Sequence, residues 1–251
     1  MARPGTGTPR RAPAPVGETL RRLAEAYPQA RCSLDHGSPL ELLVATILSA
    51  QCTDARVNMV TPGLFRRFRD AKALADAPEG ALEEAIRSTG FFNAKARSIR
   101  GAARAIVERH GGEVPRTMED LVALPGVGRK TANVVLGNAF GDPGGVVVDT
   151  HVGRIARRLG WSRHGDAGKV EDDLNRIVPR ESWVFLPHAL IHHGRAICTA
   201  RNPLCESCFL FDLCPKVGVA RRAAKAKAAR ARTRGAAARV APRKTATRRA
   251  R

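Results

Sequence analysis

Apolar residues recur at helical spacing along most of the chain. In four stretches they follow the i, i+3, i+4 pattern that places side chains on one face of an α-helix. These stretches contain Leu20, Leu23, Ala24 and Tyr27; Leu40, Leu43, Val44, Ile47 and Leu48; Ile99, Ala102, Ala103, Ile106 and Val107; and Val152, Ile155, Ala156 and Leu159. Ser38, Pro39 and Glu41 start the second stretch as an N-cap, a first-turn proline and a capping-box acid. The chain is therefore expected to be mainly helical.

The alternating pattern of a β-strand is missing. The one β-branched run, at residues 146–148, is too short and too isolated to make a sheet. We expect it to be an extended, buried connector. The predicted fold class is all-α, with no internal repeat.

Positive charge is concentrated at the two ends of this 251-residue chain. Of its 43 basic residues, three lie in residues 1–17 and fourteen in residues 216–251, and neither end has an acid. Both ends are predicted to be disordered tails because they lack the apolar residues of a core. The C-terminal tail is expected to bind a polyanion, the alternative being a solvated tail that only aids solubility.

Apolar runs are too short for a membrane-spanning helix, which needs about eighteen residues. The N-terminus also lacks the apolar core of a signal peptide. A cytoplasmic protein is therefore expected, and its cysteines should be reduced or bound to metal.

A glycine-rich turn, LPGVGRKTA at residues 124–132, separates two predicted helices that start near Thr117 and near Arg129. Gly126 and Gly128 would let the backbone turn tightly and approach a partner, and the amides of the new helix would form an anion site. The adjacent basic residues favour a DNA phosphate as that anion. An ordinary turn between two helices would use the same glycines.

Four cysteines with the spacing C-x6-C-x2-C-x5-C form the second chemical signal. They are Cys198, Cys205, Cys208 and Cys214. Four thiolates on a short loop can hold one zinc ion or an iron–sulfur cluster, although the six-residue gap fits the usual zinc pairs poorly. The remaining Cys32 and Cys52 are interpreted as small buried apolar residues.

Asp149 begins the predicted helix that ends at Leu159. An aspartate at this position is typically an N-cap. It also follows Lys130, a first-turn lysine of the preceding helix, by nineteen residues, so the fold could bring a carboxylate and an amine into one cleft.

Several segments together resemble the endonuclease III family of the helix-hairpin-helix DNA glycosylases. They are LLVATILSAQCTD, GFFNAKA, GEVP, LPGVGRKTANVVL, VDTHVGRIARRLG and the cysteine loop, in this order. The resemblance covers about residues 18–215. It implies a bifunctional DNA glycosylase and AP lyase that repairs oxidised pyrimidines in double-stranded DNA, with a 4Fe-4S cluster on the four cysteines.

The resemblance also implies roles for individual residues. Lys130 matches the family's nucleophile, which forms a Schiff base with the sugar, and Asp149 its catalytic carboxylate. Lys130 should lie in a cleft, at the positive end of its helix and beside Arg129, where its protonated form is disfavoured. Gln51 matches a polar residue that fills the gap left by a flipped nucleotide.

Two positions depart from the family pattern. Phe91 stands where the family has a second wedge, normally leucine. It could stack on the orphaned base, or Phe91 and Phe92 could simply be core residues. Arg201 is the only basic residue between the first two cysteines, so it would make that loop's phosphate contact alone.

The expected architecture is a six-helix barrel at residues 32–142 that carries the hairpin, and a cluster lobe from residues 18–31 and 143–215. The protein should be a monomer associated with the nucleoid. Two alternatives remain: an adenine or mismatch glycosylase of the same superfamily, which usually lacks this lysine, and a non-catalytic binder of DNA structures.

Overall fold

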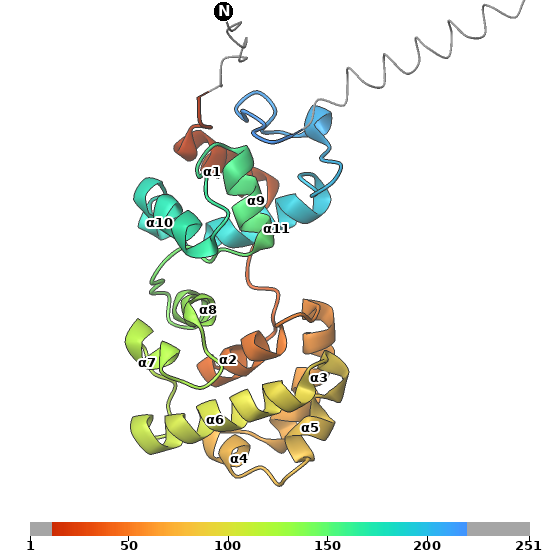
Figure 1. Ribbon diagram of the computed structural model, residues 1–251, viewed down its shortest axis with the longest axis vertical. Helices are drawn as coiled ribbons and strands as arrows, with labels where there is room; N and C mark the ends of the chain where they lie inside the picture. The colour runs from red at the N-terminus through yellow and green to blue at the C-terminus, as the bar shows by residue number, and fades with distance from the viewer. Residues whose placement is uncertain (1–11, 220–251) are drawn as a thin grey trace, which may run out of the picture. The chain divides into compact units, whose positions relative to one another are not determined.

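The computed structural model describes residues 12–219 (Figure 1), and these residues contain helices and no strand. The elements in order are α1 (Val16–Ala26), α2 (Pro39–Leu48), α3 (Asp54–Arg67), α4 (Ala71–Ala75), α5 (Ala81–Ala85), η1 (Arg87–Thr89), α6 (Phe92–His110), α7 (Met118–Val122), α8 (Arg129–Ala139), α9 (Thr150–Arg158), α10 (Ala167–Ile177), η2 (Arg180–Ser182), α11 (Phe185–Ala196) and η3 (Cys205–Ser207). The all-α prediction is confirmed. None of the helices in this part of the chain has the length and apolarity to cross a bilayer.

The first lobe consists of α2 to α8, which share one hydrophobic core. Helix α2 lies in the middle of this lobe and packs on α3, α6 and α8. For this reason Leu42 and Ala45 are buried in addition to the predicted stripe, whereas Leu40 is only half-buried. The predicted N-cap and first-turn proline of α2 are confirmed, because the Ser38 hydroxyl accepts a hydrogen bond from the amide of Glu41. The predicted capping box is not formed, because the Glu41 carboxylate accepts from the amide of Gly37.

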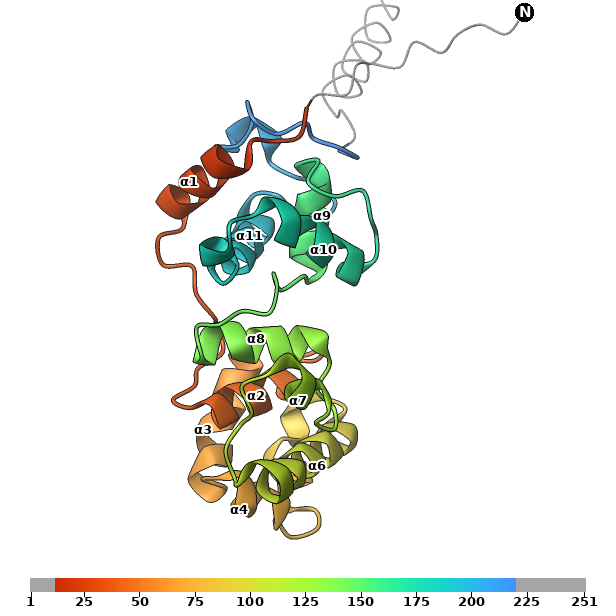
Figure 2. The same ribbon diagram turned by 90° about the vertical axis from the view of Figure 1, so that its left-hand side faces the viewer.

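The second lobe has a core of its own, formed by α1 and α9 to α11. Leu23 of α1 is fully buried there, and α1 and α9 both pack on α11; the turned view in Figure 2 shows these helices together. The connector between α8 and α9 is neither helix nor strand, and Val146 and Val148 in it are buried, as predicted.

The predicted end of the N-terminal tail at residue 17 is wrong. Helix α1 begins at Val16, and Ala14 before it is buried. The amide of Ala14 donates to the carbonyl of Leu159, and its own carbonyl accepts from Trp161 Nε1 at 2.7 Å. The alanine and its prolines therefore pack against the end of α9 although they show no periodic pattern.

The C-terminal tail prediction also begins too early. Lys216 Nζ donates to the carbonyl of Phe211 and lies over the ring of that residue, and the amide of Val217 donates to the carbonyl of Arg158. Residues 216 and 217 thus belong to the second lobe. Residues 1–11 and 220–251, which carry most of the predicted tails, lie outside the described residues.

Candidate active site and cysteine loop

The glycine-rich turn joins α7 to α8 as predicted. Gly126 has φ +77°, and a Cβ there would lie 2.4 Å from Cβ of Ser98 on α6. Only glycine fits this position, because both the backbone conformation and the space exclude a side chain. Gly128 has a different role: it is the N-cap of α8 and supplies no side-chain cap, so the first-turn amides are left for another acceptor.

Lys130 is the second residue of α8, and its side chain is exposed. The expected burial in a cleft is therefore not found. Its charge nevertheless acts on Asp54 at the start of α3. Burial alone would raise the pKa of Asp54, but hydrogen bonds from Ser33 and Arg195 and the positive charges of Arg195 and Lys130 lower it overall. The positive charge of Lys130 therefore favours the ionised form of Asp54, a residue of its own lobe.

Asp149 is the N-cap of α9. Its Oδ1 accepts hydrogen bonds of 2.8 Å from the amides of His151 and Val152. Its Oδ2 lies 3.1 Å from Nδ1 of His151. Capping therefore occupies one oxygen, while the other faces an imidazole. Within residues 12–219 there is no hydrogen bond or ion pair between Asp149 and Lys130.

The side chain of Arg129 is joined to the second lobe. Its Nε and its terminal nitrogen lie 3.0 and 2.9 Å from Oε1 of Glu171 on α10. The same oxygen accepts a hydrogen bond from Nδ2 of Asn133, also on α8. Glu171 is buried, so α10 holds the helix that carries Lys130. No sequence signal singles out Glu171, which lies among other acids in its segment.

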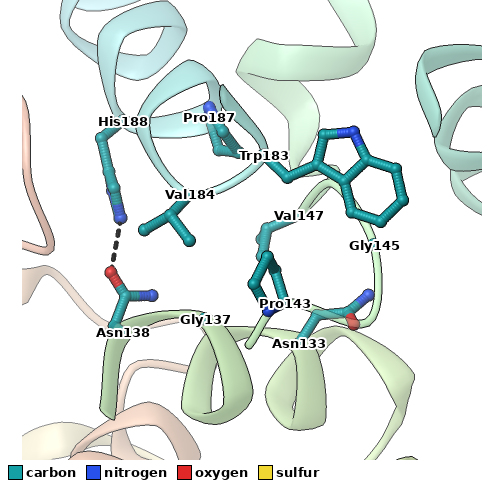
Figure 3. A pocket seen from close by; sticks show the side chains of 10 residues that line it. All are labelled: Asn133, Gly137, Asn138, Pro143, Gly145, Val147, Trp183, Val184, Pro187 and His188. Carbon is teal, nitrogen blue, oxygen red and sulfur yellow. Dashed lines mark hydrogen bonds between the residues drawn. The ribbon is translucent and has the colours of Figure 1, made fainter. Parts of the chain in front are cut away.

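Two more contacts link the lobes near this point. Arg195 of α11 donates to Asp54 at 3.0 Å. His188 of α11 pairs through Nε2 with Oδ1 of Asn138 on α8 (Figure 3), at 2.9 Å. Since Nδ2 of Asn138 donates to the carbonyl of Val134, its Oδ1 must accept from His188. Burial lowers the pKa of His188, which favours a neutral ring.

A small cavity lies beside this pair, between α8, the connector and α11 (Figure 3). Its volume of about 10 Å³ leaves room for about one water molecule and not for a nucleobase. Oδ1 of the lining residue Asn133 is buried and has no hydrogen-bond partner in the described part of the chain. The cavity is part of the packing between the lobes and is not the substrate site.

Gln51 and Phe91 lie on two exposed turns of the first lobe. Both have positive φ, +51° and +48° respectively, which is uncommon for residues other than glycine. Phe91 is 67% exposed, so its interpretation as a core residue is wrong. Phe92 does pack against the core.

The cysteine loop follows α11, and all four of its cysteines are partly buried and unpaired. Burial raises the pKa of Cys208 to about 11, and the nearby thiols of Cys198, Cys214 and Cys205 add to this rise. The four thiols are therefore near enough to influence one another in a partly buried region. Cys32 and Cys52 lie elsewhere, half-buried against the first core.

Two side chains that the sequence analysis did not identify hold this loop. Arg158 of α9 donates to the carbonyls of Cys198, Thr199 and Ala200 and to Sγ of Cys198. His193 of α11 is buried, with Nε2 3.6 Å from Sγ of Cys208. No sequence spacing indicates either contact. Arg201, on the loop itself, is exposed.

The ring of His193 is oriented by Tyr27 of α1. The hydroxyl of Tyr27 lies 3.1 Å from Nδ1 of His193. Burial lowers the pKa of His193 to about 4, so the ring is neutral and has one N–H. If Tyr27 donates to Nδ1, the proton is on Nε2 and points at the cysteine sulfur, which as a metal-bound thiolate can only accept.

Comparison with known proteins identifies the family. Residues 44–180 match the model of the HhH-GPD superfamily base excision DNA repair proteins, and residues 198–214 match the iron-sulfur binding domain of endonuclease III. The endonuclease III of Synechocystis sp. is 56% identical over 198 residues, covering 79% of this chain and 90% of that protein. The endonuclease III of Bacillus subtilis is 46% identical over 196 residues, covering 78% and 89%.

A solved structure described as a trapped endonuclease III–DNA covalent intermediate has a TM-score of 0.75 and 44% identity, and the match covers 84% of this chain and 97% of that one. The fold, the cysteine loop and the sequence identity all indicate the same family. The chain belongs to the endonuclease III family of HhH-GPD base excision DNA repair proteins.

Proposed function

We propose that this chain is a bifunctional DNA glycosylase and AP lyase that removes oxidised pyrimidines and then cuts the strand 3′ to the abasic site. The observation that carries the proposal is the placement of Lys130. It is exposed in the first turn of α8, whose N-cap residue Gly128 provides no side-chain acceptor for the first-turn amides. The similar solved structure is described as a covalent DNA intermediate, as expected for an enzyme with a nucleophile.

In this proposal the neutral amine of Lys130 attacks C1′ of the damaged nucleoside. The new N–C1′ bond forms as the bond from C1′ to the base breaks, and the base leaves with a proton. Loss of the amine proton and ring opening give a Schiff base, which acidifies the C2′ hydrogen. Removal of that hydrogen as a proton then expels the 3′ phosphate by β-elimination.

Asp149 has the geometry to assist this sequence. One of its oxygens is held by two backbone amides, so the carboxylate is fixed at the start of α9. Its other oxygen faces His151. We propose that this carboxylate stabilises the positive charge that develops on the sugar and transfers protons, because a preorganised charge is effective at such a position. Capping and catalysis are compatible.

The DNA contacts are assigned to the two turns and the hairpin. Gly126 and Gly128 bring the backbone amides near α8 to a phosphate. Gln51 and Phe91 project from exposed turns and fill the space left by the flipped nucleotide. Arg129 contributes to DNA binding mainly by positioning α8 through its bond to Glu171. Arg201 of the cysteine loop is exposed and is assigned that loop's phosphate contact.

The four cysteines are proposed to bind a 4Fe-4S cluster. The residues fit such a group because four partly buried, unpaired thiols stand on one short loop and influence one another electrostatically. When bound, the cluster supplies a one-electron redox centre and ties the loop together. Arg158 and His193 orient the loop around it.

Borohydride trapping tests the proposed function. Incubation with duplex DNA containing thymine glycol, followed by borohydride, should give a covalent complex. Lys130→Gln should abolish the complex while DNA binding persists. Lys72→Gln is the matched control, because Lys72 is an exposed lysine of the same lobe that pairs only with Asp76. Undiminished trapping in Lys130→Gln would reject the assignment.

The enzyme is expected to act as a monomer on chromosomal DNA. The basic C-terminal segment would strengthen this binding through phosphate contacts. Each contact steepens the slope of log K against log salt concentration by about 0.9. Deletion of residues 220–251, which leaves the packed residues 216 and 217 in place, should flatten that slope without changing single-turnover cleavage. An unchanged slope would assign the segment to solubility alone.

A further inference from the structure

Lys95 on α6 is a buried lysine without a role in the chemistry above. Its side chain is 5% exposed, and it has no carboxylate partner within residues 12–219. Nζ instead donates to two carbonyl oxygens, those of Leu48 and Thr89, both at 2.8 Å. Burial lowers the pKa of this amine. Burying a lysine is costly, and these two hydrogen bonds offset part of that cost.

The two carbonyls lie at the starts of the two exposed turns. Leu48 is the last residue of α2, three positions before Gln51, and Thr89 is the last residue of η1, two positions before Phe91. The backbone amide of Lys95 also donates to the carbonyl of Phe91, at 3.1 Å. One residue therefore ties together the beginnings of both turns.

Both turns contain strained backbone that this anchor helps to maintain. Gln51 and Phe91 have positive φ, a conformation that is strained for a residue with a side chain. Their side chains are exposed, so packing of those side chains does not repay the strain. The conformation must be imposed by the neighbouring backbone. Leu48 and Thr89, whose carbonyls Lys95 holds, are both buried, so they are fixed points from which the two turns begin.

We propose that Lys95 is a positioning residue that sets the turns of Gln51 and Phe91 at a fixed separation, so that both side chains enter the DNA duplex together. The inference rests on the proposed function of these two residues in filling the gap of a flipped nucleotide. Lys95 touches no DNA in this mechanism. Its three N–H groups reach two carbonyls at once, which no apolar side chain of similar length does.

The test separates nucleotide flipping from the Schiff-base chemistry of Lys130. Lys95→Met keeps the length of the side chain and removes its donors. Single-turnover cleavage of thymine-glycol duplex should fall about tenfold or more, because both hydrogen bonds that hold the two turns are lost. Borohydride trapping on a single-stranded abasic oligonucleotide, where no base pair is opened, should stay within about twofold of the wild type.

Three controls complete the experiment. Lys72→Met removes an exposed lysine of the same lobe and should change neither rate. In a Gln51→Ala, Phe91→Ala background, Lys95→Met should cause no further loss on the duplex, because residues that act through one another are not additive. Lys95→Gln, whose amide still donates to one carbonyl, should recover part of the duplex rate; it also replaces Lys95→Met if that variant does not fold.

The outcomes distinguish the role of Lys95 from the proposed function of the protein. Equal losses on duplex and single strand, an unchanged duplex rate, or a full additional loss in the alanine background would each overturn the role of Lys95. Failure of the wild type to be trapped on duplex DNA that contains thymine glycol would instead overturn the proposed function.

Discussion

The candidate active site and the cysteine loop are stabilised in opposite ways. Lys130 and Asp149 belong to different lobes, and the Lys130 helix, besides its packing in the first core, has a polar support from the second lobe through Glu171. The cysteine loop is a stretch of seventeen residues held by side chains of its own lobe, Arg158 and His193. The proposed nucleophile must be accessible to DNA, so its helix is held by contacts of other residues, Arg129 and Asn133, with Glu171. The cysteine loop needs no such access, and buried side chains of α9 and α11 hold it directly.

This contrast predicts that chemistry and stability separate at Asp149. Asp149→Asn should retain the N-cap, since asparagine caps about as well as aspartate, while single-turnover cleavage of an abasic duplex falls about 10²–10³-fold. Asp149→Ala should lose the rate and, in addition, about 1 kcal/mol of unfolding free energy. A normal rate in Asp149→Asn would leave this carboxylate as a helix cap only.

At the cysteine loop the opposite separation is expected. Arg158→Met removes a buried donor to three carbonyls and one sulfur and should lower the unfolding free energy by about 2–3 kcal/mol. Iron should be lost faster in the presence of a chelator. The cleavage rate per iron-loaded molecule should stay near that of the wild type, and a large fall in that rate would show that the loop acts on the chemistry.

The bond between the lobes is tested at Glu171. Glu171→Gln removes the charge that faces Arg129 and should lower the unfolding free energy by about 1–2 kcal/mol, because a buried, charge-assisted contact is weakened. Cleavage should slow as the first turn of α8 loses its anchor. Asp172→Asn, an exposed acid on the same helix, is the matched control; an equal effect in both variants would exclude a specific clamp.

The smallest predicted effect concerns His193. His193→Phe keeps a ring in the same place but removes the donor to Cys208. A hydrogen bond of about 1 kcal/mol corresponds to about 40 mV for one electron, and its loss should lower the reduction potential of the bound cluster because the reduced, more negative form benefits more from a donor. Cleavage should be unchanged. A potential equal to that of the wild type would assign His193 to packing.

Local signals were sufficient for much of the fold. The caps at Ser38 and Asp149 and the turn at Gly126 were predicted correctly because each depends on a few consecutive residues. The boundary of the N-terminal tail was wrong because Ala14 is buried by its contact with Trp161, 147 positions away. No periodicity can indicate such a contact.

The sequence by itself determined the helices α1, α2 and α6 to α9, the hairpin turn and the cysteine spacing, because helical periodicity, glycine conformations and ligand spacing depend on short segments. It also placed Lys130 and Asp149 at the starts of their helices. Only the tertiary structure decided that Lys130 is exposed, that Arg129 faces Glu171, and that Lys95 joins two turns. These features depend on which distant side chains share a low-dielectric interior, and that is set by packing and not by spacing along the chain.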